Sequence, residues 1–338
     1  MICSAPAPKL IQRMNIILDI QGLSTVFESK DGPVKAVDDV SITLFRGEQF
    51  GLVGESGSGK SATCRSIIQL IPSPPGKIVS GSILFEGHDL LKMSRREIRA
   101  FRGAEISMIF QDPMTSLNPV MSIGYQVAES LREHKKISRR NAREETLRLL
   151  RLVGVYDPEK RFSDYPHNFS GGMRQRVLIA MALALKPKIL LADEPTTALD
   201  VTIQDQILKL IASLQKEFDI SVILVSHDLG VIAQTCHRIA VMYAGQIVEV
   251  GHTIPVFKKP LHPYTQALMQ SIPQGVRRTH TISAIKGAPP YLAKPPEGCR
   301  FHPRCSYVQD ACRNSTYALR EIENGHFTAC INEGFIQR

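Results

Sequence analysis

A glycine-rich segment near residue 54 has the residue types that bind phosphate groups. It reads Gly-Glu-Ser-Gly-Ser-Gly-Lys-Ser over residues 54–61 and satisfies the pattern G-x-x-x-x-G-K-[ST]. Glycines let backbone N–H groups turn inward around phosphate oxygens, and a following helix adds the positive end of its dipole. In this pattern Lys60 reaches the β- and γ-phosphates, and the Ser61 hydroxyl ligates Mg²⁺. The residues assigned to this nucleotide-binding loop are Gly54, Glu55, Ser56, Gly57, Ser58, Gly59, Lys60, Ser61 and Ala62.

A pair of acids further along the chain suits the hydrolysis of such a nucleotide. The apolar run at 189–192 ends in Asp193, and Glu194 follows directly. Two adjacent acids at the end of a buried strand are costly unless a cation or a water molecule compensates them. Asp193 suits contact with Mg²⁺ through water, and Glu194 suits a general base that polarises the attacking water. The loop and the acids together predict hydrolysis of ATP or GTP.

The elements that must position these residues alternate between strand-like and helix-like segments. This alternation predicts an α/β fold with a largely parallel sheet. Gln49–Val53 is expected as a buried strand before the loop, with a helix over residues 60–70 after it. The apolar run at 222–225 predicts another buried strand, and residues 80–91 predict a hairpin.

The composition of the rest of the chain changes twice. From about residue 94 to 151 it is charged and is expected to be a helical layer, whereas apolar residues at helical spacing over 203–218 predict one amphipathic helix. Past residue 251 prolines become frequent and periodicity fades, which indicates a domain boundary.

The segment Ser170-Gly-Gly-Met-Arg-Gln-Arg resembles the LSGGQ signature of ABC transporter ATPases, with Phe169 in place of Leu and Met173 in place of Gln. A Ser-Gly-Gly step that opens a helix is a second anion-binding helix end. One triphosphate does not need two such ends in one chain, so this end is expected to complete the site of a partner subunit in a head-to-tail dimer. Residues 198–200 resemble the D-loop at the dimer seam. The residues expected to act on the partner site are Ser170, Gly171, Gly172, Gln175 and Asp200.

The same resemblance implies roles for further residues. Gln111 is similar to the Q-loop glutamine that senses Mg²⁺, so Mg²⁺ would be held by Ser61, Gln111 and Asp193. His227 resembles the switch histidine at the γ-phosphate and joins Glu194 as a catalytic residue. Phe27 resembles the aromatic residue that stacks on adenine. A purely structural role for His227 and a core role for Phe27 are the alternatives.

The resemblance covers residues 15–251 and implies a P-loop ATPase core with a RecA-like, mostly parallel sheet and an antiparallel β region. A helical subdomain at about 94–172 is inserted in it. We therefore divide the chain into a flexible tail at 1–14, an ATPase domain at 15–251 and a small irregular C-terminal domain at 252–338.

The run Leu-His-Pro-Tyr-Thr-Gln-Ala-Leu at 261–268, with the C-terminal extension, resembles the dipeptide/oligopeptide (and nickel) importer subfamily. The resemblance implies a peripheral subunit on the cytoplasmic face of the inner membrane. Its expected partners are a second, homologous ATPase, two membrane permeases and, indirectly, an extracytoplasmic peptide-binding protein. Nickel import and a soluble ABC ATPase of DNA repair or translation are the alternative functions.

Four of the seven cysteines fall in the C-terminal region, as Cys299-x₅-Cys305-x₆-Cys312-x₁₇-Cys330. No C-x₂-C pair is present, and four thiolates suit either zinc or a cubane iron–sulfur cluster. The importer subfamily carries a similar cysteine motif, and this resemblance implies a [4Fe–4S] cluster. Zinc, or no metal, is the alternative. His302 and His326 are alternative ligands or exposed loop residues, and Cys3, Cys64 and Cys236 are expected to be unligated.

The net charge of +9 leaves acidic partners open. Residues 251–338 hold eleven Lys/Arg against five Asp/Glu, a net of +6, and residues 92–151 carry the same excess. Neither region interleaves aromatic with basic residues as single-strand binders do, so we expect a solvated surface and no nucleic-acid partner. The longest apolar run, 177–185, is too short to span a bilayer, and the first residues do not predict a secretory signal.

Overall fold

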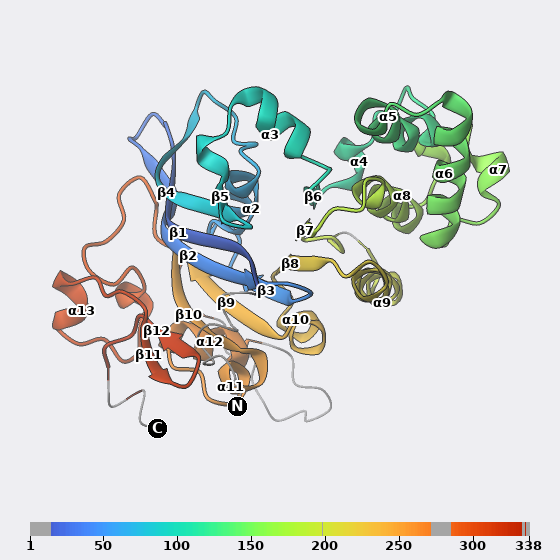
Figure 1. Cartoon of the computed structure of the whole chain (residues 1–338). Helices are drawn as coiled ribbons and strands as arrows, with labels where there is room; N and C mark the ends of the chain where they lie inside the picture. The colour runs from blue at the N-terminus through green and yellow to red at the C-terminus, as the bar shows by residue number, and fades with distance from the viewer. Residues whose placement is uncertain (1–14, 198, 272–284, 333–334, 336–338) are drawn as a thin grey trace, which may run out of the picture. The chain divides into compact units, whose positions relative to one another are not determined.

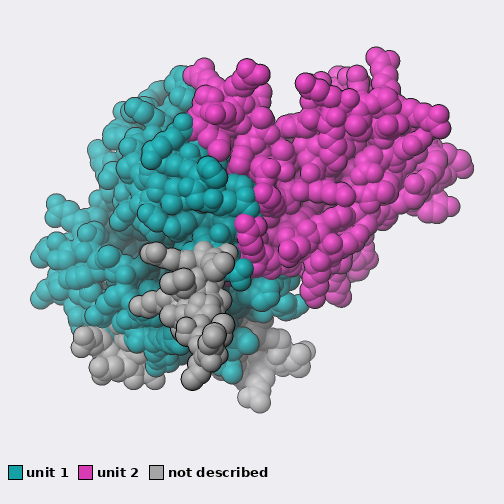
Figure 2. All heavy atoms as spheres, in the orientation of Figure 1, with its two compact units in different colours: residues 1–45, 49–92, 226–338 teal, residues 46–48, 93–225 magenta. Residues whose placement is uncertain are grey.

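The computed structural model describes residues 15–197, 199–271, 285–332 and 335. The chain divides into two compact units (Figure 2). Unit 1 consists of residues 1–45, 49–92 and 226–338, and unit 2 of residues 46–48 and 93–225.

Unit 1 contains an antiparallel sheet in which β1 (Ile16–Phe27) lies between β2 (Val34–Phe45) and β4 (Gly76–Phe85) (Figure 1). The short β5 (His88–Asp89) pairs with β4. The two residues between them, Glu86-Gly87, both have positive φ, as a two-residue hairpin turn requires. The predicted hairpin at 80–91 is therefore confirmed.

The strand that leads into the nucleotide-binding loop belongs to a second sheet in unit 1. β3 (Gln49–Val53) is fully buried and runs parallel to β9 (Arg238–Tyr243), which pairs antiparallel with β10 (Gln246–His252). β12 (His326–Thr328) pairs with β10, and β11 (Arg320–Glu323) pairs with β12. The C-terminal region is thus hydrogen-bonded to the strands beside the loop.

The helices of unit 1 are mostly short. The predicted helix after the loop forms over α2 (Lys60–Ile67), and Gln69 with its positive φ lies beyond its end. The others are η1 (Leu90–Lys92), α10 (Leu229–Thr235), α11 (Thr253–Lys258), α12 (Pro263–Gln270), η3 (His302–Arg304) and α13 (Ala311–Asn314).

Unit 2 contains three parallel strands, β6 (Ile106–Ile109), β7 (Ile189–Asp193) and β8 (Ser221–Ser226), with β7 in the middle. β7 and β8 are buried throughout, as their apolar runs predict. Together with the sheets of unit 1, they confirm the predicted α/β fold. The expectation of a helical layer over 94–151 is wrong at β6, because a strand of four residues is too short for its period to be recognised in the sequence.

The helices of unit 2 include the predicted amphipathic helix, α9 (Val201–Phe218). The others are α3 (Arg95–Phe101), α4 (Pro113–Ser116), α5 (Ile123–Lys135), α6 (Arg139–Leu152), α7 (Pro158–Arg161), η2 (Pro166–Asn168) and α8 (Gly171–Leu183). α5, α6 and α8 pack against one another.

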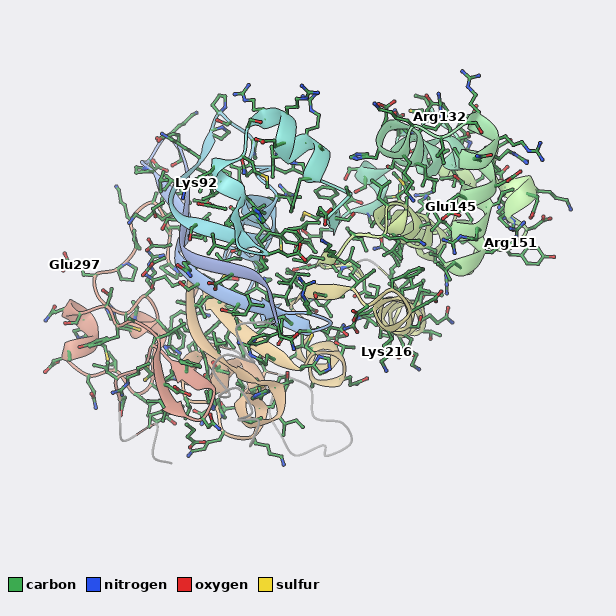
Figure 3. The ribbon with its side chains drawn as sticks, viewed as in Figure 1. Lys92, Arg132, Glu145, Arg151, Lys216 and Glu297 are labelled. Atoms are coloured by element: carbon green, nitrogen blue, oxygen red, sulfur yellow. The ribbon has the colours of Figure 1, made fainter. Side chains whose placement is uncertain are left out.

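Several charged side chains at the surface of the helical layer form ion pairs, among them those of Glu145 and Arg151, which Figure 3 labels. Arg148 donates to both oxygens of Glu145, at 2.9 and 2.8 Å, and this hydrogen bonding holds the pKa of Glu145 below its usual range. Arg151 of α6 pairs with Glu159 of α7 through a single contact, between its Nη2 and Oε1 of Glu159. These pairs agree with a solvated surface for residues 92–151. No described helix combines the length and the apolar character that a membrane crossing requires.

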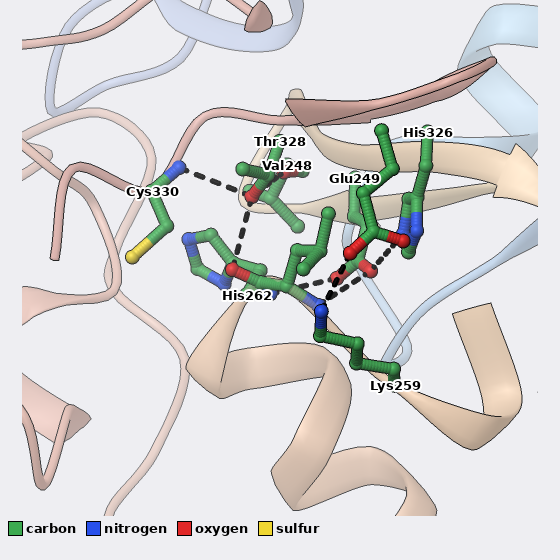
Figure 4. A network of polar contacts seen from close by, with 9 residues as sticks. Val248, Glu249, Lys259, His262, His326, Thr328 and Cys330 are labelled. Carbon is green, nitrogen blue, oxygen red and sulfur yellow. Dashed lines mark hydrogen bonds and ion pairs between the residues drawn. The ribbon is translucent and has the colours of Figure 1, made fainter. Parts of the chain in front are cut away.

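A buried polar network joins the C-terminal strands to α12 (Figure 4). The carboxylate of Glu249 accepts the backbone N–H groups of Leu261 and His262, at 2.8 and 2.9 Å. Its Oε1 also lies 2.7 Å from Nε2 of His326. The prediction of an exposed loop position for His326 is wrong, because this side chain is 2 % exposed and pairs with a carboxylate that lies far away in the sequence.

His262 in this network makes the stability of the fold sensitive to acid. Its Nδ1 accepts the N–H of Tyr264 at 3.1 Å and caps α12, and burial lowers its pKa to about 3. In the unfolded chain the imidazole of His262 binds a proton near pH 6.5, whereas in the folded chain it does so only near pH 3. The folded state therefore loses stability as the pH falls from about 6.5 toward 3, by at most about 1.4 kcal/mol per pH unit. In His262→Asn, which keeps a capping acceptor, we expect urea midpoints to fall less steeply between about pH 7 and pH 5. Equal slopes for the two proteins would contradict this.

Candidate nucleotide-binding site

The nucleotide-binding loop lies unusually close to the strands of unit 1. Gly54 and Gly59 both have positive φ, at 155° and 108°. A Cβ atom at Gly54 would lie 2.1 Å from the carbonyl oxygen of Met242, and one at Gly59 would lie 2.1 Å from that of Ala36. Because both neighbours are backbone atoms of paired strands, they cannot move aside. These two positions therefore require glycine.

The positive charge of this loop is provided by Lys60. Its side chain is buried, and its ammonium donates to the carbonyl oxygens of Gly54 and Glu55 at 2.8 and 2.9 Å. No side chain caps α2, and its first turn contains no acid. The start of α2 thus offers N–H donors and a positive charge to an anion.

The predicted general base lies in unit 2, where the structure brings two separate motifs together. Oε2 of Glu194 accepts a hydrogen bond from Nε2 of Gln111 at 3.0 Å and another from the hydroxyl of Thr197 at 2.9 Å. Gln111 follows β6, and Glu194 follows β7. The contact to Thr197 was not predicted, although this residue lies in the Pro-Thr-Thr run directly after the acids.

The backbone at Glu194 is strained. Its φ is +46°, which is uncommon for a residue with a side chain. Its N–H donates to the carbonyl oxygen of Val225 at 3.1 Å, so a neighbouring strand helps to hold this conformation. Strained residues of this kind cluster at functional sites, at a cost of about 1–3 kcal/mol each. Asp193, the residue before it, is fully buried.

The other predicted nucleotide contacts are in unit 1. Phe27 ends β1 opposite Gly76 of β4, and a Cβ atom at Gly76 would lie 2.8 Å from its ring. His227 is exposed and follows β8. Ser61 begins α2 together with Lys60.

The signature segment lies at the start of α8 and the D-loop at the start of α9, both in unit 2. Ser170 caps α8 and Asp200 caps α9, each through its side-chain oxygen. A Cβ atom at Gly171 would lie 3.4 Å from Leu199. Ser170 and Gly171 are exposed, whereas Gln175 is 1 % exposed and cannot meet a partner's nucleotide in this arrangement. Ala198 lies outside the described residues.

The four C-terminal cysteines line one cavity in unit 1. Burial raises the pKa of three of these thiols. The pKa of Cys299 lies above its usual range, that of Cys305 is raised to about 11, and that of Cys330 is raised to about 12. His302 lines the cavity too, but its Nδ1 lies 3.0 Å from the carbonyl oxygen of Cys299. No three His, Cys, Asp or Glu residues in the described part of the chain are grouped as they stand to hold a metal ion. Cys64 and Cys236 are buried elsewhere, and Cys3 lies outside the described residues.

Comparisons with known proteins agree with both halves of the chain. The family model described as "ABC transporter" matches residues 37–197. That of the "Oligopeptide/dipeptide transporter, C-terminal region" matches residues 248–312. The dipeptide transport ATP-binding protein DppD of Bacillus subtilis is 52% identical, over 88% of this chain and 89% of its own length. The oligopeptide transport ATP-binding protein OppD of Salmonella typhimurium is 45% identical over 98% of both chains.

Solved structures of similar fold come from the same class of protein. The dimeric ATP-binding cassette MJ0796, bound to ADP and Pi, has a TM-score of 0.63 and 26% identity, and the match covers 70% of this chain and 98% of that one. The CbiO1 protein of Clostridium perfringens, part of an ABC transporter complex, has a TM-score of 0.62 and 29% identity, covering 72% and 92%.

The two glycines of the signature should respond differently to substitution. A Cβ atom at Gly172 would lie 2.6 Å from the Cγ2 of Ile203 on α9, whereas Gly171 has 3.4 Å to its nearest neighbour. We expect Gly172→Ala to lower the free energy of unfolding by about 1–3 kcal/mol, since the helices must separate. Gly171→Ala should change it by less than about 1 kcal/mol. Urea unfolding of the two matched variants measures this, and equal losses would contradict it.

Proposed function

We propose that this chain, which belongs to the ATP-binding subunits of ABC transporters, hydrolyses ATP to drive the import of dipeptides or oligopeptides. The observation that carries the hydrolytic part is the pair of hydrogen bonds that Gln111 and Thr197 donate to Glu194. Peptide as the cargo rests on the relatives, whose names specify dipeptide or oligopeptide transport. Nickel import is the alternative cargo.

Each group of residues has its own role in ATP hydrolysis. Lys60 binds the β- and γ-phosphates, and it exchanges the carbonyl oxygens of Gly54 and Glu55 for phosphate oxygens when ATP enters. The N–H groups of the loop and of the first turn of α2 bind the remaining phosphate oxygens. Phe27 stacks on the adenine, and His227 contacts the γ-phosphate.

Glu194 acts as the general base toward the attacking water. Since Gln111 and Thr197 both bond to the same carboxylate oxygen, they fix the orientation of the group before ATP arrives. Ser61, Gln111 and Asp193 supply a hydroxyl, an amide oxygen and a carboxylate, which are the oxygen donors that Mg²⁺ prefers. When bound there, Mg²⁺ would neutralise charge on the phosphates.

The signature residues serve a second subunit. Ser170, Gly171 and Gly172 complete the nucleotide site of a partner ATPase, most simply a homologous but different chain, with Asp200 at the seam. The exposure of Ser170 and Gly171 supports this role, whereas the burial of Gln175 restricts it to support of the helix. Two membrane permeases and an extracytoplasmic peptide-binding protein complete the importer, which places this chain at the cytoplasmic face of the inner membrane.

The C-terminal cysteines hold a [4Fe–4S] cluster in this proposal, with zinc as the alternative. Support comes from the cavity that Cys299, Cys305, Cys312 and Cys330 line together. Four cysteine thiolates are the ligand set that a cubane cluster would take. Backbone N–H groups also face the sulfurs, as that of Tyr307 does at 3.4 Å from Sγ of Cys305. A bound cluster would cross-link the segments that carry these cysteines.

The role of Glu194 is tested by Glu194→Gln. The amide cannot accept a proton, so we expect ATP turnover to fall by about 10²–10⁴-fold while ATP binding remains. Because ATP then persists, the partner interface should stay closed, and the complex should migrate as a dimer of ATPase subunits in gel filtration with ATP. Phosphate release and nucleotide binding are measured on the same preparation. Turnover at the wild-type rate would contradict the assignment.

Lys60→Ala is the matched control, because it should remove nucleotide binding itself. In cells, a strain carrying Glu194→Gln should fail to grow on peptides as its source of amino acids and should take up nickel normally. Loss of nickel uptake with growth on peptides intact would favour the alternative cargo.

The cluster is tested by Cys305→Ser, with Cys236→Ser as the control because Cys236 is buried outside the cavity. In anaerobic preparations the wild type and the control should contain iron and show a broad charge-transfer absorption, which Cys305→Ser should lose. Stoichiometric zinc without iron would support the alternative, and neither metal would exclude both.

A further inference from the structure

The acid in the nucleotide-binding loop is paired with an arginine from the C-terminal region. Nη1 of Arg304 lies 2.7 Å from Oε2 of Glu55, and Nη2 lies 3.0 Å from Oε1. The pair is therefore bidentate, which is the strongest geometry for these two groups. The Arg304 side chain is 5 % exposed and that of Glu55 is 24 % exposed, so the pair is largely shielded from water.

All five N–H donors of this guanidinium have partners. Besides Glu55, Nη1 reaches the hydroxyl of Tyr243 at 3.2 Å, Nη2 the carbonyl oxygen of Gly287 at 3.2 Å, and Nε that of Lys286 at 2.9 Å. Hydrogen bonding to Glu55 raises the pKa of Arg304, which keeps it charged. A fully used set of donors fixes the side chain in one position.

Aromatic side chains hold the same loop residue from another direction. The N–H of Glu55 donates to the hydroxyl of Tyr264 on α12 at 2.9 Å. The rings of Tyr243 and Tyr264 lie 4.5 Å apart between centroids, and Phe301 packs on Tyr243 at 5.2 Å. The backbone and the side chain of Glu55 are therefore both bound by residues outside the loop.

A second arginine of the same segment supports the other side of the loop. Arg300 pairs with Asp38 and donates to the carbonyl oxygen of Ala244. The next residue, Gly245, donates its N–H to the carbonyl oxygen of Ser58 at 2.8 Å. The segment between Cys299 and Cys305 thus contacts the loop in two ways. Arg304 bonds to the loop directly, whereas Arg300 bonds to the turn at Ala244 and Gly245, which in turn bonds to the loop.

We propose that Arg304 is a positioning residue for ATP binding, which neutralises Glu55 and holds the loop ready for phosphate. The inference rests on the proposed ATP binding. An unpaired carboxylate in a phosphate-binding loop would repel the triphosphate and would attract the ammonium of Lys60 away from it. With Arg304 in place, the negative charge is balanced, and the ATP affinity of the chain depends on its C-terminal region.

The test measures the equilibrium binding of ATP to the full-length chain. We expect Arg304→Gln to raise the Kd by about tenfold, because one charged pair is lost beside a bound anion. Arg304→Lys keeps the charge but not the bidentate geometry, so its Kd for ATP should lie between that of the wild type and that of Arg304→Gln. The double variant Glu55→Gln/Arg304→Gln should bind ATP more tightly than Arg304→Gln alone, since the uncompensated carboxylate is gone. A merely structural contact would not give this recovery.

Arg313→Gln is the matched control, because Arg313 is an exposed arginine of the same region, and it should bind ATP as the wild type does. If the wild type binds no ATP, the proposed function fails. If the wild type binds ATP and Arg304→Gln binds it equally well, or if the double variant is no better than Arg304→Gln, this inference is overturned. If Arg304→Gln does not fold, Arg304→Lys and the double variant are compared instead. The inference is overturned if Arg304→Lys has the same Kd for ATP as the wild type. It is also overturned if the double variant binds ATP more weakly than Arg304→Lys does.

Discussion

The close contact between the nucleotide-binding loop and the backbone of β2 and β9 is the constraint on which unit 1 depends. With no Cβ at Gly54 and Gly59, the loop can touch the carbonyl oxygens of Met242 and Ala36. That proximity presses the loop against the turn between β9 and β10, where Gly245 bonds to Ser58. Since β10 also pairs with β12, the strands that support the loop are shared with the C-terminal region. The phosphate site and the C-terminal extension are thus one packed structure.

Sequence reasoning worked best where a short motif determines its own backbone. The loop at 54–61, the buried strands that end near Val53 and Asp193, and the helix start at Ser170 all form where they were expected. In these segments glycines, capping residues and apolar runs act on neighbours only a few residues away. The same local rules predicted the α/β fold, because the order of strands and helices follows from such segments.

The contacts that sequence reasoning missed join residues far apart in the chain. The pairing of Arg304 with Glu55 spans 249 positions, and that of His326 with Glu249 spans 77. No local pattern distinguishes these side chains from others on a surface. The hydroxyl of Thr197, only three residues from Glu194, was missed for another reason, since its direction depends on the strained backbone between them. The division into a tail, an ATPase domain and a C-terminal domain stays a prediction.

The charge of the C-terminal region also needs a finer interpretation than a solvated basic surface. Arg300 and Arg304 are among its eleven basic residues, and both are largely buried against acids of the ATPase core. A buried charge is costly unless a partner and hydrogen bonds compensate it. Separating either arginine from its acid would therefore leave both the guanidinium and the carboxylate without a partner. Both arginines lie between Cys299 and Cys305, so the segment whose cysteines line the cavity also supplies the partners of Asp38 and Glu55 and couples that cavity to the core through two ion pairs. A net charge counted along the sequence cannot reveal this coupling, because it assigns the same value to a solvated arginine and to one that holds the loop.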